Sequence, residues 1–231
     1  MSRGRVIAVV GAESTGKSTL APALAARIVD LTGLRCAVVG EVLREWCERE
    51  GRTPRAEEQM GIAMEQRRRT DEAAAGHDLV VADTMPLMIA VYSRLLFDDA
   101  SLVPMAIAAQ RAASLTLLTA LDLPWVADGH QRDGEHVREP VDRQLRELML
   151  AHGLDWSVIG GTGAARLEHA FDAVSPLLAT LAPAGSGLFT RLAARDAAMP
   201  AWRWVCEKCD VPDCEHAALR TAQGQRSPTA G

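Results

Sequence analysis

The stretch Gly11-Ala12-Glu13-Ser14-Thr15-Gly16-Lys17-Ser18 follows an apolar run at residues 6–10 and matches the phosphate-binding pattern G-x-x-x-x-G-K-[ST] at every fixed position. The two glycines permit backbone conformations that a Cβ atom would obstruct, so that consecutive N–H groups turn toward a β-phosphate at the start of a helix. The lysine supplies positive charge to the β- and γ-phosphates, and the hydroxyl after it is placed to ligate Mg²⁺. The pattern therefore predicts an ATP site formed by Gly11, Ala12, Glu13, Ser14, Thr15, Gly16, Lys17, Ser18 and Thr19.

Strand-like and helix-like patterns alternate after this loop. Short apolar runs predict five strands, at about 6–10, 35–39, 79–82, 115–120 and 156–159. Apolar residues at helical spacing predict helices at about 17–31, 42–49, 57–75, 86–96, 102–114, 139–152 and 164–181. In the 57–75 helix we expect Met60, Ala63 and Met64 on the buried side. The alternation is typical of an α/β fold, a P-loop NTPase three-layer sandwich with a five-stranded parallel sheet, which binds ligands at the carboxyl ends of its strands.

Length, composition and charge restrict the class of protein. The 231 residues are 48% hydrophobic and 24% charged, which predicts a kinase or ATPase domain at 1–182 followed by a linker and tail at 183–231 with a disordered end. A net charge of -5 argues against general nucleic-acid binding. Because no stretch is long enough to cross a bilayer and none reads as a signal peptide, we expect a cytoplasmic protein with no membrane partner. The sequence leaves the oligomeric state open.

Acidic residues follow two of the predicted strands at the edge where ligands bind. Asp83 ends the third strand, where P-loop enzymes commonly keep an acid that holds Mg²⁺ directly or through water; alternatively, it caps the next helix. Glu41 ends the second strand, where an acceptor hydroxyl needs a base or an orienting partner; alternatively, it is a solvated carboxylate at a helix start. We predict catalytic roles for Lys17, Glu41 and Asp83, and Mg²⁺ ligation by Ser18 and Asp83.

Arginines supply candidate cations for the same edge. Arg44 and Glu45 lie one turn after the acid of the second strand, where they can project into the same cleft. Arg132 and Arg138 lie where a mobile lid would bring a cation onto the migrating phosphoryl group, and we assign a catalytic role to Arg132. The run Arg67-Arg68-Arg69 either steers a phosphate or forms a solvated charged face.

At these residues the chain resembles a known family. The phosphate loop, Glu41-x-x-Arg44-Glu45, the strand ending in Asp83-Thr84, and Asp122-x-Pro124-Trp125-x-x-Asp128-Gly129-x-x-Arg132 together look like the ribosylnicotinamide kinase domain of NadR-type proteins, over about residues 4–181. The resemblance implies transfer of the γ-phosphoryl group of ATP to the 5′-hydroxyl of nicotinamide riboside, in NAD salvage. It also implies that this nucleoside-like substrate is bound by Glu41, Arg44, Glu45, Trp125 and Asp128. The chain departs from the family in the aromatic residues that stack on the nicotinamide ring, because Gly40 precedes the Arg-Glu element and the 57–75 helix has no aromatic.

The C-terminal tail carries a second candidate metal site. Cys206-x-x-Cys209 can present two thiolates to one ion from a tight turn, and Pro212 with Asp213 suits the chain reversal that would bring Cys214 back. We predict a structural Zn²⁺ held by Cys206, Cys209, Cys214 and His216. The alternative is a set of reduced cysteines in a flexible tail.

Three functional interpretations remain open from the residues. The main one is an ATP-dependent kinase of a nucleoside-like metabolite. The others are a P-loop ATPase or kinase acting on another small substrate, and an ATP-driven switch whose zinc-binding module contacts a partner. A kinase should show low basal ADP release that a specific nucleoside raises.

Overall fold

Five parallel strands form one sheet in the order β2-β3-β1-β4-β5, with β1 at its centre. The computed structural model describes residues 3–126 and 134–181, all of them in the first of the two units into which the chain divides, Met1–Leu188. The strands are β1 (Arg5–Val10), β2 (Cys36–Val39), β3 (Leu79–Asp83), β4 (Leu115–Thr119) and β5 (Ser157–Ile159). The five-stranded parallel sheet expected from the sequence is thus confirmed.

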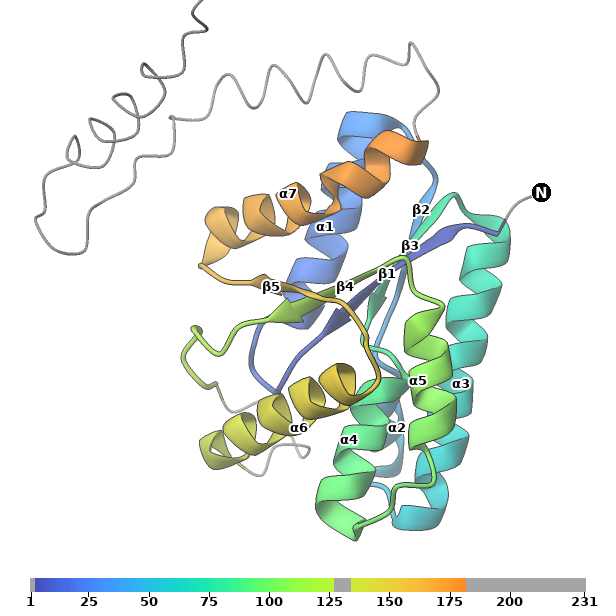
Figure 1. Cartoon of the computed structure of the whole chain (residues 1–231), viewed down its shortest axis with the longest axis vertical. Coiled ribbons are helices and arrows are strands. Elements are labelled where there is room, and N and C mark those ends of the chain that lie inside the picture. Colours follow the sequence, from blue (N-terminus) through green and yellow to red (C-terminus); the bar gives the residue numbers. More distant parts are fainter. Residues whose placement is uncertain (1–2, 127–133, 182–231) are drawn as a thin grey trace, which may run out of the picture. The chain divides into compact units, whose positions relative to one another are not determined.

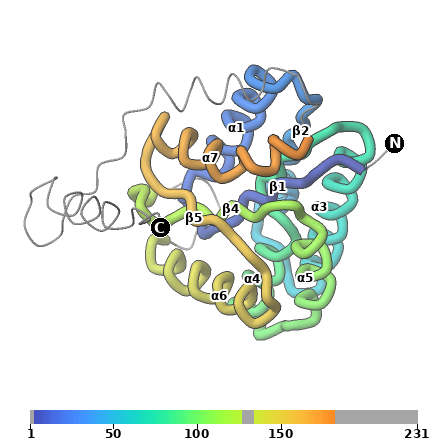
Figure 2. The backbone as a smooth tube through the Cα atoms, turned by 45° about the horizontal axis from the view of Figure 1, so that its top comes forward, coloured from blue at the N-terminus to red at the C-terminus, as the bar shows by residue number. Residues whose placement is uncertain are grey.

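Helices cover both faces of this sheet. They are α1 (Lys17–Thr32), α2 (Val42–Glu50), α3 (Ala56–Gly76), α4 (Pro86–Phe97), α5 (Val103–Arg111), α6 (Arg138–Ala151) and α7 (Gly163–Leu181), with a 3₁₀ turn η2 at Glu135–Val137. Helices α1 and α7 pack together on one face, and α3, α4, α5 and α6 cover the other (Figure 1). Figure 2 shows the same layers from a second direction. The three-layer arrangement follows from right-handed strand–helix–strand crossovers.

The chain leaves the two neighbouring strands β1 and β3 toward opposite faces of the sheet. Strand β1 leads into α1 on one face, whereas β3 leads into α4 on the other (Figure 1). Parallel sheets open a crevice at the carboxyl ends of such a pair, because the two connections diverge there. The phosphate loop and Asp83 both lie at this point, since Val9 of β1 is paired with Asp83 of β3.

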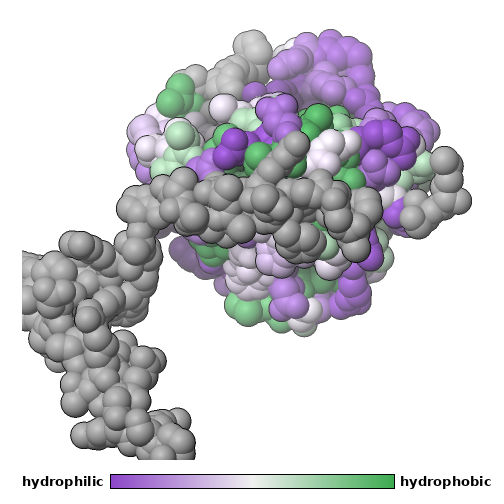
Figure 3. Space-filling model, turned by 90° about the horizontal axis from the view of Figure 1, so that it is seen from above, coloured by the Kyte–Doolittle hydropathy of each residue, from purple (hydrophilic) through white to green (hydrophobic). Residues whose placement is uncertain are grey.

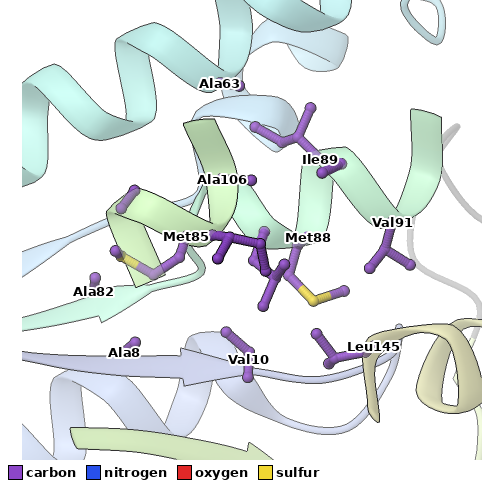
Figure 4. Packing of buried hydrophobic residues seen from close by; sticks show 14 of the residues in the cluster. Ala8, Val10, Ala63, Ala82, Met85, Met88, Ile89, Val91, Ala106 and Leu145 are labelled. Carbon is purple, nitrogen blue, oxygen red and sulfur yellow. The ribbon is translucent and has the colours of Figure 1, made fainter. Parts of the chain in front are cut away.

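The core on the α4 side explains why the central strands read as continuous apolar runs. Val10 of β1 lies near Met88 of α4 and Leu145 of α6, and Ala8 of β1 lies in the same cluster near Ala82 (Figure 4). All five side chains are at most 1% exposed. Since the opposite face of β1 is also covered, by α1, none of its apolar residues after Arg5 is left in water.

Helix α3 buries two of the three residues expected on its core side, since Met60 packs partly buried against the core and Ala63 is fully buried. Met64 is 59% exposed, so its assignment to the buried side is wrong. The buried face includes Gln66, whose Oε1 accepts from the backbone N–H of Val42 at 2.8 Å and whose Nε2 donates to the carbonyl of Gly40 at 3.2 Å. Polar contacts to the start of α2 therefore help orient α3, and a hydrophobic pattern alone does not register them.

The charged run on α3 is a solvated, ion-paired face. Arg68 pairs with Glu65 at 2.6 Å, Arg69 with Glu45 at 2.6 Å, and Arg67 lies 3.6 Å from Asp71. These guanidinium groups are paired with carboxylates, which favours a solvated charged face over a role in steering a phosphate.

Hydrophilic and hydrophobic residues intermingle on the visible part of the molecular surface in Figure 3. Among the described residues, no helix combines the length and the apolar character needed to cross a membrane.

Candidate active site

The phosphate loop joins β1 to α1 and is held by the end of β4. Its backbone is left-handed at Ser14 (φ 56°) and Gly16 (φ 78°), and Gly16 caps the start of α1. Thr15 donates its hydroxyl to the carbonyl of Ala12 at 2.8 Å, and the same Oγ1 lies 2.6 Å from Oγ1 of Thr119. The loop therefore owes its shape partly to a strand more than one hundred residues away.

Lys17 lies among carboxylates at the first turn of α1. Its side chain is buried, the residue being 8% exposed, and Nζ donates to the carbonyl of Ala12 at 2.8 Å. Burial lowers the pKa of Lys17, while the negative charges of Glu41, Asp83 and Glu13 oppose that shift. The cation is thus directed at the loop and matched by acids, as a group that neutralises phosphate charge requires.

Asp83 has the environment of a metal ligand. It ends β3, is 5% exposed, and its Oδ1 is buried without a hydrogen-bond partner. Buried carboxylate oxygens nearly always have a partner, and Mg²⁺ takes oxygen ligands from carboxylates, hydroxyls and phosphates. Ser18, the next residue after Lys17, is exposed and lines a cavity together with residues of the phosphate loop. These residues fit the Mg²⁺ that accompanies ATP in P-loop proteins.

Glu41 is a largely buried carboxylate beside Arg44. It stands at the N-cap position of α2, its side chain is 12% exposed, and Oε2 lies 3.5 Å from Nε of Arg44. Burial raises the pKa of Glu41, and Asp83 adds to the rise, whereas Lys17 and Arg44 lower it. A carboxylate with a raised pKa in a cleft is a candidate proton acceptor.

A cavity of about 280 Å³ opens beside Glu41 and Lys17. Its size lies near the lower end of small-ligand pockets, roughly 300–1,000 Å³. Burial raises the pKa of the Cys47 thiol in its wall to about 11. The wall combines carboxylates and cations at one part with mostly apolar side chains elsewhere: Glu13, Lys17, Glu41, Leu43, Arg44, Cys47, Thr53, Pro54, Gln59, Tyr92, Leu95, Leu96, His136, Val137, Pro140 and Val141.

A second cavity, of about 470 Å³, lies along the phosphate loop. Lys17 and Arg44 line both cavities, so the two meet at these cations. Glu13, expected at the ATP site, lines the first cavity instead. The second is lined by Ser14, Thr15, Gly16, Lys17, Ser18, Thr19, Arg44, Leu123, Pro124 and Val126. The arrangement suits two substrates that approach one lysine from different sides.

The remaining predicted site residues are distributed as follows. Glu45 lines neither of the two cavities and pairs with Arg69 of α3 at 2.6 Å. Trp125 is partly buried, its indole Nε1 lacks a hydrogen-bond partner, and its neighbour Val126 accepts from and donates to the Ser14 hydroxyl. Asp128 and Arg132 lie outside the described residues. So do the expected zinc ligands Cys206, Cys209, Cys214 and His216.

Two arginines brace the site in ways that the sequence did not indicate. Arg138 is not a lid cation: it is 5% exposed and donates to the carbonyl of Leu123 at 2.9 Å. Arg166 of α7 is 4% exposed and donates to Oδ1 of Asp122 at 2.7 Å and to the carbonyl of Thr15 at 2.8 Å. Burial opposes ionisation of Asp122, but Arg166 and the Gly161 amide outweigh it and lower its pKa. Arg166 lies one helical turn before the buried Ala170, so the helical spacing of the sequence could have placed it on the buried face of α7.

The comparisons with known proteins agree with this geometry. A family model described as an AAA domain matches residues 6–166. The structure is similar to two crystal structures of NadR protein, in complex with NAD and AMP-PNP (TM-score 0.59) and with NR (TM-score 0.60), each at 20% identity over 75% of this chain. The chain spans about half, 49%, of those NadR chains. The thymidylate kinase from Ehrlichia chaffeensis matches over 76% of this chain and 100% of its own, at 13% identity and a TM-score of 0.55. A search of the curated proteins finds no match. The resemblance to NadR-type proteins is confirmed at the level of the fold.

Proposed function

The chain belongs to the family described as an AAA domain, and from this premise we propose that it is a kinase that phosphorylates a nucleoside-like small molecule with ATP. The observation that carries the proposal is the pair of cavities that meet at Lys17 and Arg44. An ATPase needs one nucleotide groove and a water molecule. A second, largely apolar cavity with a buried carboxylate at its charged part supports an organic acceptor.

The residues divide the reaction between them. The phosphate loop and Lys17 bind the phosphates of ATP and offset the charge that develops in the transition state. Ser18 and Asp83 would hold Mg²⁺, which supplies further charge neutralisation at the phosphates. Glu41 accepts the proton of the acceptor hydroxyl as its oxygen bonds to the γ-phosphorus, and ADP leaves with the electrons of the broken P–O bond.

Nicotinamide riboside is the acceptor that we propose to test first. The NR in one structural neighbour and the residues shared with NadR-type proteins motivate this choice. The aromatic residues that stack on the nicotinamide ring in the family are missing from this sequence, but Tyr92 of α4 lines the cavity and supplies an aromatic side chain there.

A nucleotide acceptor is the second candidate. Arg44 lines the acceptor cavity, and an arginine there can bind a phosphate group on the acceptor. The similarity in fold to a thymidylate kinase is compatible with this alternative. Nucleoside monophosphates therefore belong beside nucleosides in the acceptor panel.

The test is acceptor-dependent ADP release in a coupled assay with ATP and Mg²⁺. We expect low basal turnover that rises at least tenfold with one nucleoside, and a phosphorylated product in stoichiometric amount. High basal turnover that no acceptor raises would establish an ATPase instead. Stimulation by a monophosphate alone would favour the nucleotide kinase.

We further propose, from the sequence alone, that the protein is cytoplasmic, acts in NAD metabolism, and carries one structural zinc ion in the tail at 183–231. The cysteine and histidine spacing supports the zinc. Neither the NAD-metabolism role nor the zinc is needed for the kinase proposal, so each can fail separately.

A further inference from the structure

The wall of the acceptor cavity contains one neutral amide side chain with an unused hydrogen-bonding group. Gln59 lies in the first turn of α3 and is 1% exposed. Its Oε1 is buried and has no hydrogen-bond partner. Gln59 lines the cavity together with Cys47, Thr53 and Pro54. The buried amide therefore borders a space in which a ligand can lie.

A second glutamine on the same helix shows what a satisfied amide does here. Gln66, two turns further along α3, uses both ends of its side chain to bind the backbone on either side of Glu41. Seven residues of α-helix correspond to roughly 10 Å along the axis. Gln66 thus marks the level of Glu41, and Gln59 lies roughly 10 Å beyond it along α3. A nucleoside whose 5′-hydroxyl lies at Glu41 would direct its base toward Gln59.

Buried amides are rarely left unpaired. An unpaired amide loses its hydrogen bonds to water without gaining others in the protein, which costs free energy. We propose that Gln59 is a specificity-determining residue that pairs with an amide edge on the base of the acceptor, either a carboxamide or a ring lactam. An amide offers one N–H donor and one C=O acceptor side by side, and so does the glutamine side chain. Two antiparallel hydrogen bonds would satisfy both groups. The inference rests on the proposed kinase function and narrows its substrate class.

The pairing predicts strong discrimination between bases of similar shape. A base without the amide edge would leave Gln59 unpaired in the complex, and sites built around a hydrogen bond reject such analogues more strongly than apolar pockets reject a missing methylene. Two matched pairs of acceptors test this. Nicotinamide riboside is compared with the pyridinium riboside that lacks the carboxamide, and uridine with its 4-deoxy analogue.

The experiment measures kcat/KM for whichever pair the wild-type protein uses, in the wild type and in Gln59→Leu. We expect the wild type to prefer the amide-bearing member by about tenfold or more. In Gln59→Leu this preference should shrink to about threefold or less, through loss of rate with the amide-bearing member. The melting temperature should not fall, because an unpaired buried amide is replaced by an apolar side chain. Gln59→Met repeats the test should the leucine variant not fold.

Gln110→Leu is the matched control. Gln110 is likewise buried, at 2% exposed, with an unpartnered Oε1, but it lines a separate cavity with Leu154 and Trp156. It should keep the wild-type preference. An equal preference in wild type and both Gln59 variants would overturn this inference and leave the kinase standing. A wild-type protein that phosphorylates no nucleoside at all would overturn both.

Discussion

A Cβ atom on Gly11 would lie 2.1 Å from the side-chain oxygen of Thr119, closer than any ordinary atomic contact allows. Thr119 ends β4, donates to the carbonyl of Val10 at 3.2 Å and contacts the hydroxyl of Thr15 at 2.6 Å. The first glycine of the phosphate loop is therefore required by a neighbouring strand as well as by the loop's own backbone. The loop and the end of β4 form one structural unit.

Gly11→Ala should lower both the melting temperature and the affinity for ATP, because Thr119 cannot move without losing its hydrogen bonds. Thr119→Ala removes the nearest atom, so the double variant should recover about 1 kcal/mol of the loss in a double-mutant cycle. Gly61→Ala is the control: a Cβ atom there meets nothing within 4 Å, and alanine should stabilise the interior of α3 by about 0.5–1 kcal/mol. If the effects of Gly11→Ala and Thr119→Ala on stability were additive, the proposed clash between these residues would be contradicted.

Lys17→Met should abolish phosphoryl transfer while the protein stays folded. The side chain is buried beside phosphate-binding backbone, and loss of such a charge removes several kcal/mol of transition-state stabilisation, a fall in kcat of at least ~10²-fold. Arg67→Met, on the exposed face of α3, removes one positive charge elsewhere and should leave the rate unchanged. Normal ATP turnover in a folded Lys17→Met protein would refute the assignment of the loop.

Asp83→Asn and Glu41→Gln should affect different steps. Asp83 has an unpartnered buried oxygen suited to Mg²⁺, so its amide variant should need more Mg²⁺ for basal and acceptor-stimulated turnover alike. Glu41→Gln should reduce mainly the acceptor-stimulated kcat, with ATP binding retained. Steady-state rates at varied Mg²⁺ separate the two. If both substitutions had equal and mild effects, Asp83 would be better explained as a helix cap and Glu41 as a solvated carboxylate.

The activity should decline in acid with an inflection above the ordinary glutamate pKa. Burial raises the pKa of Glu41, and a base works only while it is ionised, so kcat/KM should fall as the pH drops through the raised value. The pH dependence of folding stability runs in the opposite direction from that of activity. The favourable contribution of this carboxyl is fully present below its unfolded pKa and is lost as the pH rises through the folded value. Glu41→Gln should thus gain stability over wild type at neutral pH, but not in acid, by urea denaturation.

Protein purified under reducing conditions without added metal should contain about one zinc per chain. Cys206, Cys209, Cys214 and His216 are four ligand-type residues in a short span. Replacing Cys206 and Cys209 by serine should remove the metal, as measured by elemental analysis, and leave ATP binding intact. Protein in which no zinc is found would refute this site.

The sequence by itself determined the class of fold and the phosphate-binding end of the site. The loop at 11–18 is contiguous, so its function is encoded in eight neighbouring residues. Strands and helices were predicted to within a few residues for the same reason, since periodicity and caps act over one or two turns. Asp83 and Glu41 were placed at strand ends by that pattern alone. The likeness of the fold to NadR-type proteins was also recognisable from local motifs.

The tertiary structure decided which residues line the cavity beside the phosphate loop. Gln59, Tyr92 and His136 come from α3, α4 and η2, and only the order of the strands and the packing of the helices bring them to one cavity. Glu45 shows the converse: it adjoins Arg44 in sequence, yet it pairs with α3 instead of lining the cavity. Side-chain partners are set by contacts between distant segments, whereas helical and strand periodicity is a property of neighbours along the chain. Local sequence could therefore predict the phosphate site and the charged part of the cavity beside it, but not the rest of the cavity wall.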